Sequence, residues 1–550
     1  MLKKSCFCFI DLINYKHLLT LLLYLFLLLN FSISYAQKVI LRDELNRFSG
    51  GKPITFDPTN VADRPTIQIL QDMFEGLTRI DRNGKVIMAL AESYRVENNN
   101  TTYIFKMRPN AKWSDGTQVT AEHCALPIKR LMNPKISTVV GFSAFPILNS
   151  KKVFENQLPV NKLGVYAINP LTLMIKLEHP FPHFLELLSS INYVCLHPRS
   201  YDKNSIFIEH FPTISNSAYQ IHSYEEDKFI ILEKNPYYYN NEKVQINKVT
   251  YYFMEDLLSQ MNMYLTGQAN MTVANISSED IPYLEEKLVD NQIKSNQSND
   301  VMLLLLNTSK PPFKNNLKLR KALSLVIDRG ELAKSILSKP EYKVFDIVPY
   351  SIEDYKVYTP EWSSWPFEKR VAEAKKLMRQ AGYEKKKLAL QIKFNYYPDN
   401  YKLAKGIAEK FEKYLNISVS LERQEFKNNI QDVRAGKYQL SINKFYPNYL
   451  DAIEYLSILK SKSKENLTFM RDPVFDALLD KASRENDYNK RNKILQAAGK
   501  KGMENYTIIP LVNYLSKYLI NYDIDGYTNH DSYVKLYSQD LFFKKMVIPQ

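Results

Sequence analysis

The feature that most constrains the fold lies between residues 388 and 421, where two strand patterns flank a helical one. Apolar residues alternate along the first strand: Leu388, Leu390, Ile392, Phe394 and Tyr396. They recur three or four apart in the helix: Leu403, Ile407, Phe411 and Tyr414. They alternate again in the second strand: Ile417, Val419 and Leu421. A crossover of this length predicts parallel pairing, and therefore an α/β region.

The predicted secondary structure differs between the part of the chain before residue 300 and the part after it. Helices are predicted over Leu317–Ile327 and from Pro366 to Gly382, which is placed where a helix C-terminus favours positive φ. Before residue 300 the pattern is mostly short strands: Thr101–Met107, Phe229–Leu232 and Lys248–Phe253. A chain of 550 residues is too long for one ordinary domain. We therefore expect at least two lobes.

Residues 1–36 have the order of a secretory signal. Lys3, Lys4 and Lys16 precede the apolar run Leu18–Leu29, and small residues follow in Ser34-Tyr35-Ala36. As a helix the run covers about 18 Å, short of the ~30 Å hydrocarbon core, so cleavage is preferred over the alternative of a retained anchor. The cysteines of this segment, Cys6 and Cys8, lie before the run, so no lipid-attachment cysteine follows it. We expect a soluble protein exported to the periplasm.

Composition argues against nucleic acid as a partner and leaves open whether the last two cysteines form a disulfide. The net charge of +14 is spread over the whole chain, and neither zinc-finger spacing nor a basic stripe with interleaved aromatic residues supports nucleic-acid binding. Beyond the signal only Cys124 and Cys195 remain. An oxidising compartment permits a disulfide between them, and two separate buried thiols are the alternative.

Motifs for catalysis or metal binding are missing from the sequence. It contains no G-x-S-x-G elbow, no phosphate-binding P-loop and no G-x-G-x-x-G turn. His179 and His183 have the spacing of a zinc-binding helix, but Pro180 and Pro182 prevent that helix, so a structural role is favoured. We expect no catalytic residue, no metal site and no cofactor. Aromatic residues make up 13% of the chain and cluster at 237–239, 251–253 and 445–446, which suits either a ligand cleft or an ordinary core.

One stretch resembles a known family closely. Ala111-Lys112-Trp113-Ser114-Asp115-Gly116-Thr117, continued by Val119-Thr120-Ala121, is similar to the signature of the solute-binding proteins of bacterial peptide ABC importers, the oligopeptide-binding family. Further matching segments follow in order over the mature chain: Phe74–Leu77, Leu90–Ser93, Ser217–Tyr219, Leu232–Tyr238, Asn307 with Pro311–Phe313, Arg320–Leu323, Ala372–Gly382 and Asp525–Tyr527.

The resemblance implies an α/β, two-lobed periplasmic-binding-protein clamp of type II-like architecture with an additional inserted small domain. Lobe I would be discontinuous and comprise residues 37–74, 199–299 and 516–550. The inserted domain would span 75–198, and the second α/β lobe 300–515. Such a clamp closes about a hinge around its ligand and releases it unchanged, so no enzymatic activity is expected.

The ligand contacts implied by the resemblance are partly altered. The candidate binding residues are Phe426, Arg434, Phe445, Tyr446, Asn448 and Asp451. Asn448 occupies the position of a family Asp that pairs with the amino terminus of the peptide, and an amide supplies no charge. Asp451 could compensate or be a plain solvated carboxylate, and Arg434 is a shifted candidate for the peptide carboxylate. Pro447 removes a backbone donor, and His123 replaces the usual acidic residue after Ala121-Glu122.

The family implies capture of peptides and their delivery to an inner-membrane ABC permease with its ATPase subunits, by a monomer. The change at Asn448 motivates alternatives that keep the clamp, with a nickel chelate, haem, an opine-like molecule or a murein peptide as ligand. A secreted hydrolase or a chaperone-like protein on the same scaffold is the third hypothesis.

Overall fold

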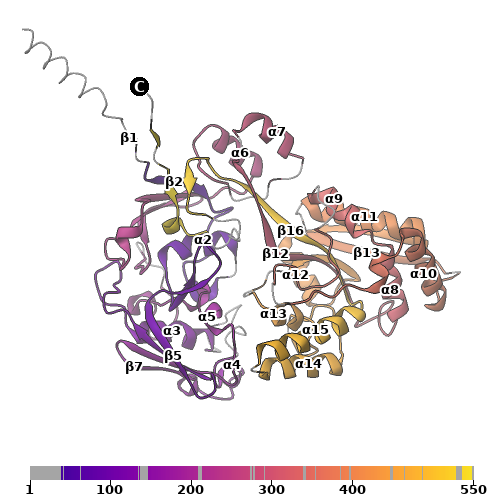
Figure 1. Ribbon diagram of the computed structural model, residues 1–550, viewed down its shortest axis with the longest axis horizontal. Coiled ribbons are helices and arrows are strands. Elements are labelled where there is room, and N and C mark those ends of the chain that lie inside the picture. The colour runs from indigo at the N-terminus through magenta and orange to yellow at the C-terminus, as the bar shows by residue number, and fades with distance from the viewer. Residues whose placement is uncertain are drawn as a thin grey trace, which may run out of the picture.

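A computed structural model describes residues 39–40 and 42–547, apart from short stretches. These stretches are 62, 134–135, 137–145, 209–212, 273–275, 277–278, 290, 338–341, 353–354, 385, 396–397, 446, 448–449, 464, 486, 528–535 and 545. The predicted signal, residues 1–36, lies outside the described part. Figure 1 shows two lobes side by side, with the chain entering the second lobe near residue 300 and returning to the first near its C-terminus. In the residues that the structure describes, no helix is long and apolar enough to cross a membrane.

The first lobe contains two four-stranded sheets. One has the order β2 (Glu44–Phe48), β11 (Lys248–Tyr252), β10 (Phe229–Lys234) and β9 (Tyr219–Glu225), with β2 parallel to β11. The other is antiparallel, with the order β5 (Ala91–Glu97), β6 (Thr102–Met107), β8 (Thr172–Lys176) and β7 (Val165–Asn169). The predicted alternation in β6 is confirmed, because Tyr103, Phe105 and Met107 are all buried. Three strands of the sequence analysis thus form where the pattern indicated.

The second lobe is the predicted α/β region. Its sheet has the order β14 (Ile417–Gln424), β13 (Leu388–Asn395), β15 (Leu440–Phe445), β12 (Ile293–Leu306) and β16 (Ile508–Leu519). Helix α11 (Pro398–Leu415) connects β13 to β14, and these strands pair in parallel as expected. Helices α8 (Leu317–Val326) and α10 (Phe367–Gln380) lie where they were predicted, and Gly382 has a φ of +88° just after α10.

The remaining helices divide between the lobes. The first lobe carries α2 (Arg64–Met73), α3 (Ala121–Leu131), α4 (Ser150–Phe154) and α5 (Phe184–Leu187). Helices α6 (Leu257–Leu265) and α7 (Ile281–Lys287) lie above the junction of the lobes in Figure 1. The second lobe adds α9 (Arg329–Leu337), α12 (Phe426–Arg434), α13 (Ala452–Ser457), α14 (Pro473–Arg484) and α15 (Tyr488–Glu504).

Strands β12 and β16 run from the junction into the second lobe as an antiparallel pair (Figure 1). Their register shifts between Gln297 and Val301, and such irregularities bend strands locally. In the first lobe a single hydrophobic core extends from Leu45 to Tyr251 and includes C-terminal residues from Tyr518 to Phe543. The predicted insert 75–198 therefore shares its core with the segments on both sides, and the division into domains stays a prediction.

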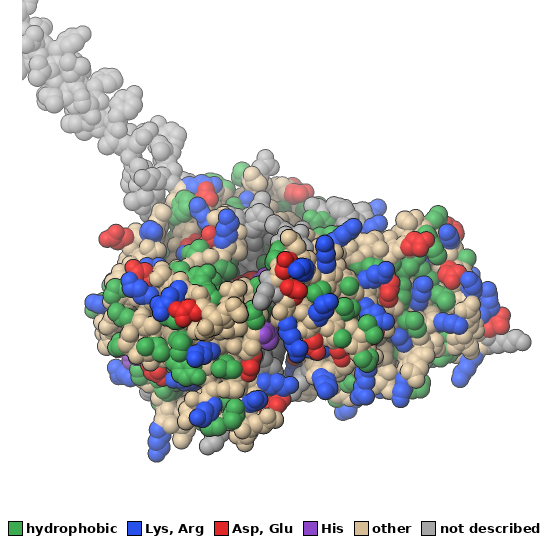
Figure 2. Space-filling view, turned by 60° about the horizontal axis from the view of Figure 1, so that its bottom comes forward, with side chains coloured by type: hydrophobic (Ala, Val, Ile, Leu, Met, Phe, Trp, Pro, Cys, Tyr) green, Lys and Arg blue, Asp and Glu red, His purple; other side chains and the backbone are tan. Residues whose placement is uncertain are grey.

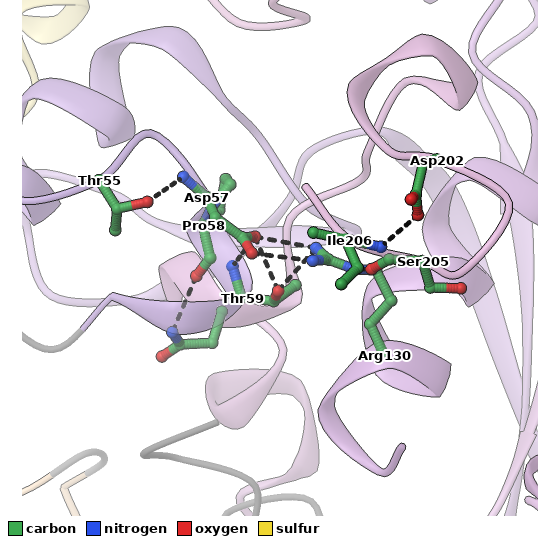
Figure 3. Close-up of polar contacts among 9 residues, drawn as sticks. Thr55, Asp57, Pro58, Thr59, Arg130, Asp202, Ser205 and Ile206 are labelled. Atoms are coloured by element: carbon green, nitrogen blue, oxygen red, sulfur yellow. Dashed lines mark hydrogen bonds and ion pairs between the residues drawn. The ribbon is translucent and has the colours of Figure 1, made fainter. Parts of the chain in front are cut away.

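A buried ion pair holds helix α3 against the start of the first lobe (Figure 3). The guanidinium of Arg130 donates to both carboxylate oxygens of Asp57 at 2.8 Å and to the hydroxyl of Thr59 at 2.8 Å. Its Nε donates to the carbonyl of Ser205 at 3.0 Å. Arg130 is 1% exposed, so this bidentate, fully hydrogen-bonded arrangement is the kind that offsets the desolvation of a buried charge.

The substitution at His123 has a structural explanation. Its Nδ1 accepts hydrogen bonds from the backbone N–H of Thr120 (3.2 Å) and from the indole N–H of Trp113 (3.1 Å). An acidic side chain three residues into a helix makes the first of these contacts in a capping box. Burial, followed by the charge of His197, lowers the pKa of His123 to about 4, so the neutral ring supplies the acceptor. The capping role survives the change of residue.

The open question of the two cysteines is answered by a disulfide between Cys124 and Cys195, 71 residues apart. It joins helix α3 to the segment after Tyr193, where the backbone N–H of Leu196 also donates to the carbonyl of His123 at 2.9 Å. The covalent link and this hydrogen bond fix the same crossing, inside the first lobe.

We predict that replacing both cysteines, Cys124→Ala with Cys195→Ala, lowers the free energy of unfolding by about 2–5 kcal/mol, because the unfolded chain regains the freedom of a long closed loop. Urea denaturation checks this. The native chain with reductant is the matched control, and it should unfold at the same lower urea concentration as the double variant. An unchanged midpoint in reductant would contradict the prediction.

Candidate functional site

The two lobes touch at a polar junction between α5 and α13. Nε2 of His183, which precedes α5, lies 2.5 Å from Oδ2 of Asp451, which precedes α13. Beside it, the backbone N–H of Leu450 donates to Oε1 of Glu186 at 2.8 Å. Figure 2 shows one face on which the lobes meet, with basic and acidic side chains on both sides of the boundary. The junction places Leu450 and Asp451 directly against the first lobe.

A cavity of about 210 Å³ adjoins this junction. Residues of both lobes line it: His183, Ser351, Ile352, Tyr355, Leu450, Asp451, Ala452, Tyr488 and Asn492. Its walls are more polar than those of a usual small-molecule site, since His183, Ser351, Asp451 and Asn492 line it beside apolar and tyrosine side chains. This cavity, which Leu450 and Asp451 help to line, forms the candidate binding region.

Asp451 is the most strongly held residue of the region. Arg491 donates to both of its carboxylate oxygens, at 2.8 and 2.9 Å, and Oδ1 also accepts from the backbone N–H of Ile453 at 2.7 Å, capping α13. Burial alone would raise the pKa of Asp451, but the hydrogen bonds from His183 and Arg491 outweigh it and hold the pKa well below its usual range. The carboxylate is therefore ionised and fixed in place. The alternative of a plain solvated Asp is wrong, because Asp451 is 5% exposed.

A second carboxylate receives cations from both lobes. Oδ2 of Asp300, in β12, lies 3.2 Å from the guanidinium of Arg64 at the start of α2 and 3.0 Å from Nζ of Lys444 in β15. Nearby, the hydroxyl of Tyr455 donates to the carbonyl of Asn299 at 2.8 Å. These contacts lie at the register shift of β12, so Asp300 couples the two lobes where the connecting strands cross.

The other predicted site residues are distributed unevenly. Phe445 ends β15 and its ring lies 5.4 Å from that of Tyr455, facing the hydrophobic core of the second lobe. Arg434 ends α12, is exposed, and its nearest recorded carboxylate is Glu465 at 3.8 Å. Phe426 begins α12, but its side chain is outside the described part, as are Tyr446 and Asn448 entirely. The structure thus describes the surroundings of Phe445, Arg434 and Asp451, and the ligand-binding roles of all six residues stay predictions.

Two of the aromatic clusters belong to the core. Tyr238 is buried and its hydroxyl donates to Oε1 of Glu75 at 3.2 Å. Tyr251 is buried and its hydroxyl donates to Oδ2 of Asp72 at 2.8 Å. Their polar tips satisfy buried carboxylates rather than facing a ligand, which is the ordinary-core interpretation of these patterns.

Sequence reasoning missed the partners of the junction. His183 was considered only as a metal ligand, because of its spacing from His179, and neither Glu186 nor Arg491 was a candidate residue. Among the residues that the structure describes, no group of three or more His, Cys, Asp and Glu side chains could hold a metal ion. The sequence contains a signal for one part of this arrangement, because an Asp before a short helix indicates an N-terminal cap, as Asp451 does for α13. The distant partner of that Asp, Arg491, is set by the tertiary fold.

Comparison with known proteins decides the family. Residues 85–467 match the sequence profile of the bacterial extracellular solute-binding proteins, family 5, middle region. The chain belongs to this family. Two relatives illustrate its range. The periplasmic oligopeptide-binding protein OppA of Salmonella typhimurium is 27% identical over 92% of this chain and 93% of its own length. The probable deoxycholate-binding periplasmic protein YgiS of Escherichia coli is 29% identical over 90% and 92%.

Solved structures of family 5 solute-binding proteins share the fold. The murein tripeptide-binding protein MppA of Escherichia coli superposes with a TM-score of 0.82 at 26% identity, covering 92% of this chain and 99% of that one. Its unliganded open form superposes less well, with a TM-score of 0.75 at the same identity and coverage. The two-lobed α/β clamp predicted from the sequence is confirmed.

We predict that Arg491→Leu lowers the free energy of unfolding by about 3–5 kcal/mol, because it leaves the Asp451 carboxylate buried without its main cation. Arg434→Leu is the matched control and should change this free energy by less than about 1 kcal/mol, since its ion pair is exposed. Urea denaturation at pH 7 measures both. Equal effects of the two substitutions would contradict the structural role of Arg491.

Proposed function

We propose that this chain is the periplasmic substrate-binding component of a peptide ABC importer. It would capture peptides between its lobes by hinge closure and deliver them, chemically unchanged, to an inner-membrane permease with its ATPase subunits. The carrying observation is that a member of the family 5 solute-binding proteins brings its two lobes together at Leu450 and Asp451, beside a cavity that residues of both lobes line. A solved relative, OppA of Haemophilus influenzae, is described as a complex with the peptide RPPGFSPFR, and it superposes with a TM-score of 0.80 at 25% identity.

The connection between the lobes supports a hinge. Strands β12 and β16 cross from one lobe to the other, with a shift of register between Gln297 and Val301. A few residues at the ends of elements are enough to absorb the dihedral changes of a domain closure. The described contacts between the lobes at Asp300 and Asp451 are polar, and polar contacts of this kind suit a reversible interface.

The segment after β15 is the proposed ligand strand. The family grips peptides through backbone hydrogen bonds, like an added strand, which gives affinity without strict choice of side chains. Phe426, Phe445, Tyr446, Asn448 and Asp451 are the proposed wall of this site, with Arg434 as the proposed partner of a peptide carboxylate. Since Arg491 already neutralises Asp451, we propose a structural rather than a ligand-pairing role for that carboxylate.

A non-peptide ligand is the second candidate. Two observations favour it: Asn448 lacks the charge that would pair with a peptide ammonium, and the relative YgiS is named as a probable binder of deoxycholate, a bile acid. A murein peptide lies between the two cases, because MppA, which is 28% identical over 96% of this chain, is named for binding one.

The cellular location and the oligomeric state of the protein are part of the same proposal. The relatives OppA of Salmonella typhimurium and MppA of Escherichia coli are named as periplasmic proteins, and residues 1–36 have the order of a secretory signal. We propose export with cleavage after Ala36, without a lipid anchor, and function as a monomer.

Native mass spectrometry of the purified chain, followed by calorimetry with a mixed peptide pool, tests the function. We expect a ladder of bound peptides and none of them shortened. Deoxycholate, a murein tripeptide, haem and a nickel chelate are the competing arms. Retention of one of these with no peptide binding would replace the peptide proposal, and recovery of cleaved peptides would favour the hydrolase.

The substitution Asn448→Asp offers a sharper prediction. It should tighten binding of a peptide with a free amino terminus by roughly tenfold, because a charge-assisted hydrogen bond to the ammonium is gained. The same peptide with an acetylated amino terminus is the matched control and should bind both proteins equally. Calorimetry of the four pairs checks this, and an equal gain for both peptides would show that residue 448 does not face the ammonium.

A further inference from the structure

Helix α5 makes two polar contacts across the junction within one turn. His183 reaches Asp451 at 2.5 Å through Nε2, while its Nδ1 lies 3.2 Å from Oε2 of Glu186. The other oxygen of Glu186 accepts from the backbone N–H of Leu450. His183 and Glu186 therefore bind two consecutive residues of the opposite lobe, at the edge of the candidate binding region.

The opposite side of this contact is rigid. Arg491 holds both oxygens of Asp451, and Asp451 also caps α13. Opening of the lobes would leave the Asp451–Arg491 pair intact, because both residues belong to the second lobe. Opening must break the contacts of His183 with Asp451 and of Glu186 with Leu450, together with the pair of Arg64 and Asp300.

The charges of the junction balance only when His183 carries a proton. Two carboxylates, Asp451 and Glu186, then face two cations, Arg491 and the imidazolium. A neutral His183 would leave one excess negative charge in a largely buried cluster, where charge is poorly solvated.

We propose that His183 and Glu186 form a latch that holds the two lobes closed while His183 is protonated and weakens when the proton leaves. His183 is a positioning residue in this proposal, since it acts on the arrangement of the lobes and not on the ligand. The proposal rests on the hinge motion of the proposed function, but it does not depend on the identity of the ligand.

The direction of the pH dependence follows from the surroundings of His183. It faces Glu186 from its own helix, and Asp451, Tyr355 and Tyr488 around the adjoining cavity, with Arg491 behind Asp451. Burial alone would lower the pKa of His183, but the hydrogen bonds and charges of Asp451 and Glu186 raise it to about 9. In the open form the ring is solvated and its pKa returns to about 6.5.

The closed form therefore binds the proton more tightly than the open form. Its advantage is fully present below about pH 6.5 and is lost as the pH rises through about 9. Between these values the ratio of closed to open molecules should fall by about tenfold for each pH unit. The chain superposes less well on the unliganded open form of MppA, with a TM-score of 0.75, than on another structure of MppA, with a TM-score of 0.82.

Small-angle X-ray scattering of the purified chain without ligand, from pH 6 to pH 9.5, tests the latch. We expect the radius of gyration of the native protein to increase over this range, and His183→Gln to be expanded and independent of pH throughout. His222→Gln is the matched control, because His222 is an exposed histidine of β9 paired with Glu233. It should reproduce the native profile.

Two further variants separate the latch from a merely structural role. His183→Lys keeps a cation to higher pH and should stay compact at pH 9, which would rescue closure. Glu186→Gln removes one carboxylate and should move the transition to lower pH. A native profile without pH dependence, or a His183→Gln profile like that of the native protein, would overturn the proposal. Because no ligand is added, a failure to bind peptides would refute the proposed function and leave this result standing.

Discussion

The arrangement of the two lobes depends on one buried carboxylate. Asp451 caps α13, forms a bidentate pair with Arg491 and contacts His183 of the first lobe. An ionised carboxylate is stable in a buried position only when its oxygens are fully satisfied. The cap and the guanidinium meet that condition within the second lobe. The interaction of Asp451 with His183 therefore acts between the lobes, where it can form and break without unfolding either lobe.

The first lobe uses the same principle for a different purpose. Arg130 and Asp57 form a fully hydrogen-bonded pair, and the disulfide between Cys124 and Cys195 closes the same helix onto its surroundings. These interactions are internal to one lobe and oppose motion within it. A clamp needs rigid halves, because flexible lobes would spend the free energy of ligand binding on ordering themselves. Rigid lobes and polar, reversible contacts between them are therefore both needed for closure about a hinge.

Local pattern predicted five elements of the second lobe: α8, α10, β13, α11 and β14. The alternation that begins at Leu388 and the helical spacing from Leu403 each reflect burial on one face of one element, which adjacent residues alone determine. Family resemblance supplied the clamp and the prediction that ligand contacts follow β15. The resemblance also flagged His123 and Asn448 as departures. For His123 the structure supplies the reason: its ring nitrogen accepts the same backbone hydrogen bond as the acidic side chain that it replaces.

The sequence by itself determined the α/β lobe, the strand patterns of the first lobe and the membership of key segments in a clamp. Only the tertiary structure decided that Cys124 pairs with Cys195, that Asp451 is buried against Arg491, and that His183 faces it from the other lobe. The physical reason is the separation along the sequence of the residues that interact. Periodicity and capping arise between residues a few positions apart, whereas a disulfide or a buried ion pair joins residues that only the folded chain brings within bonding distance.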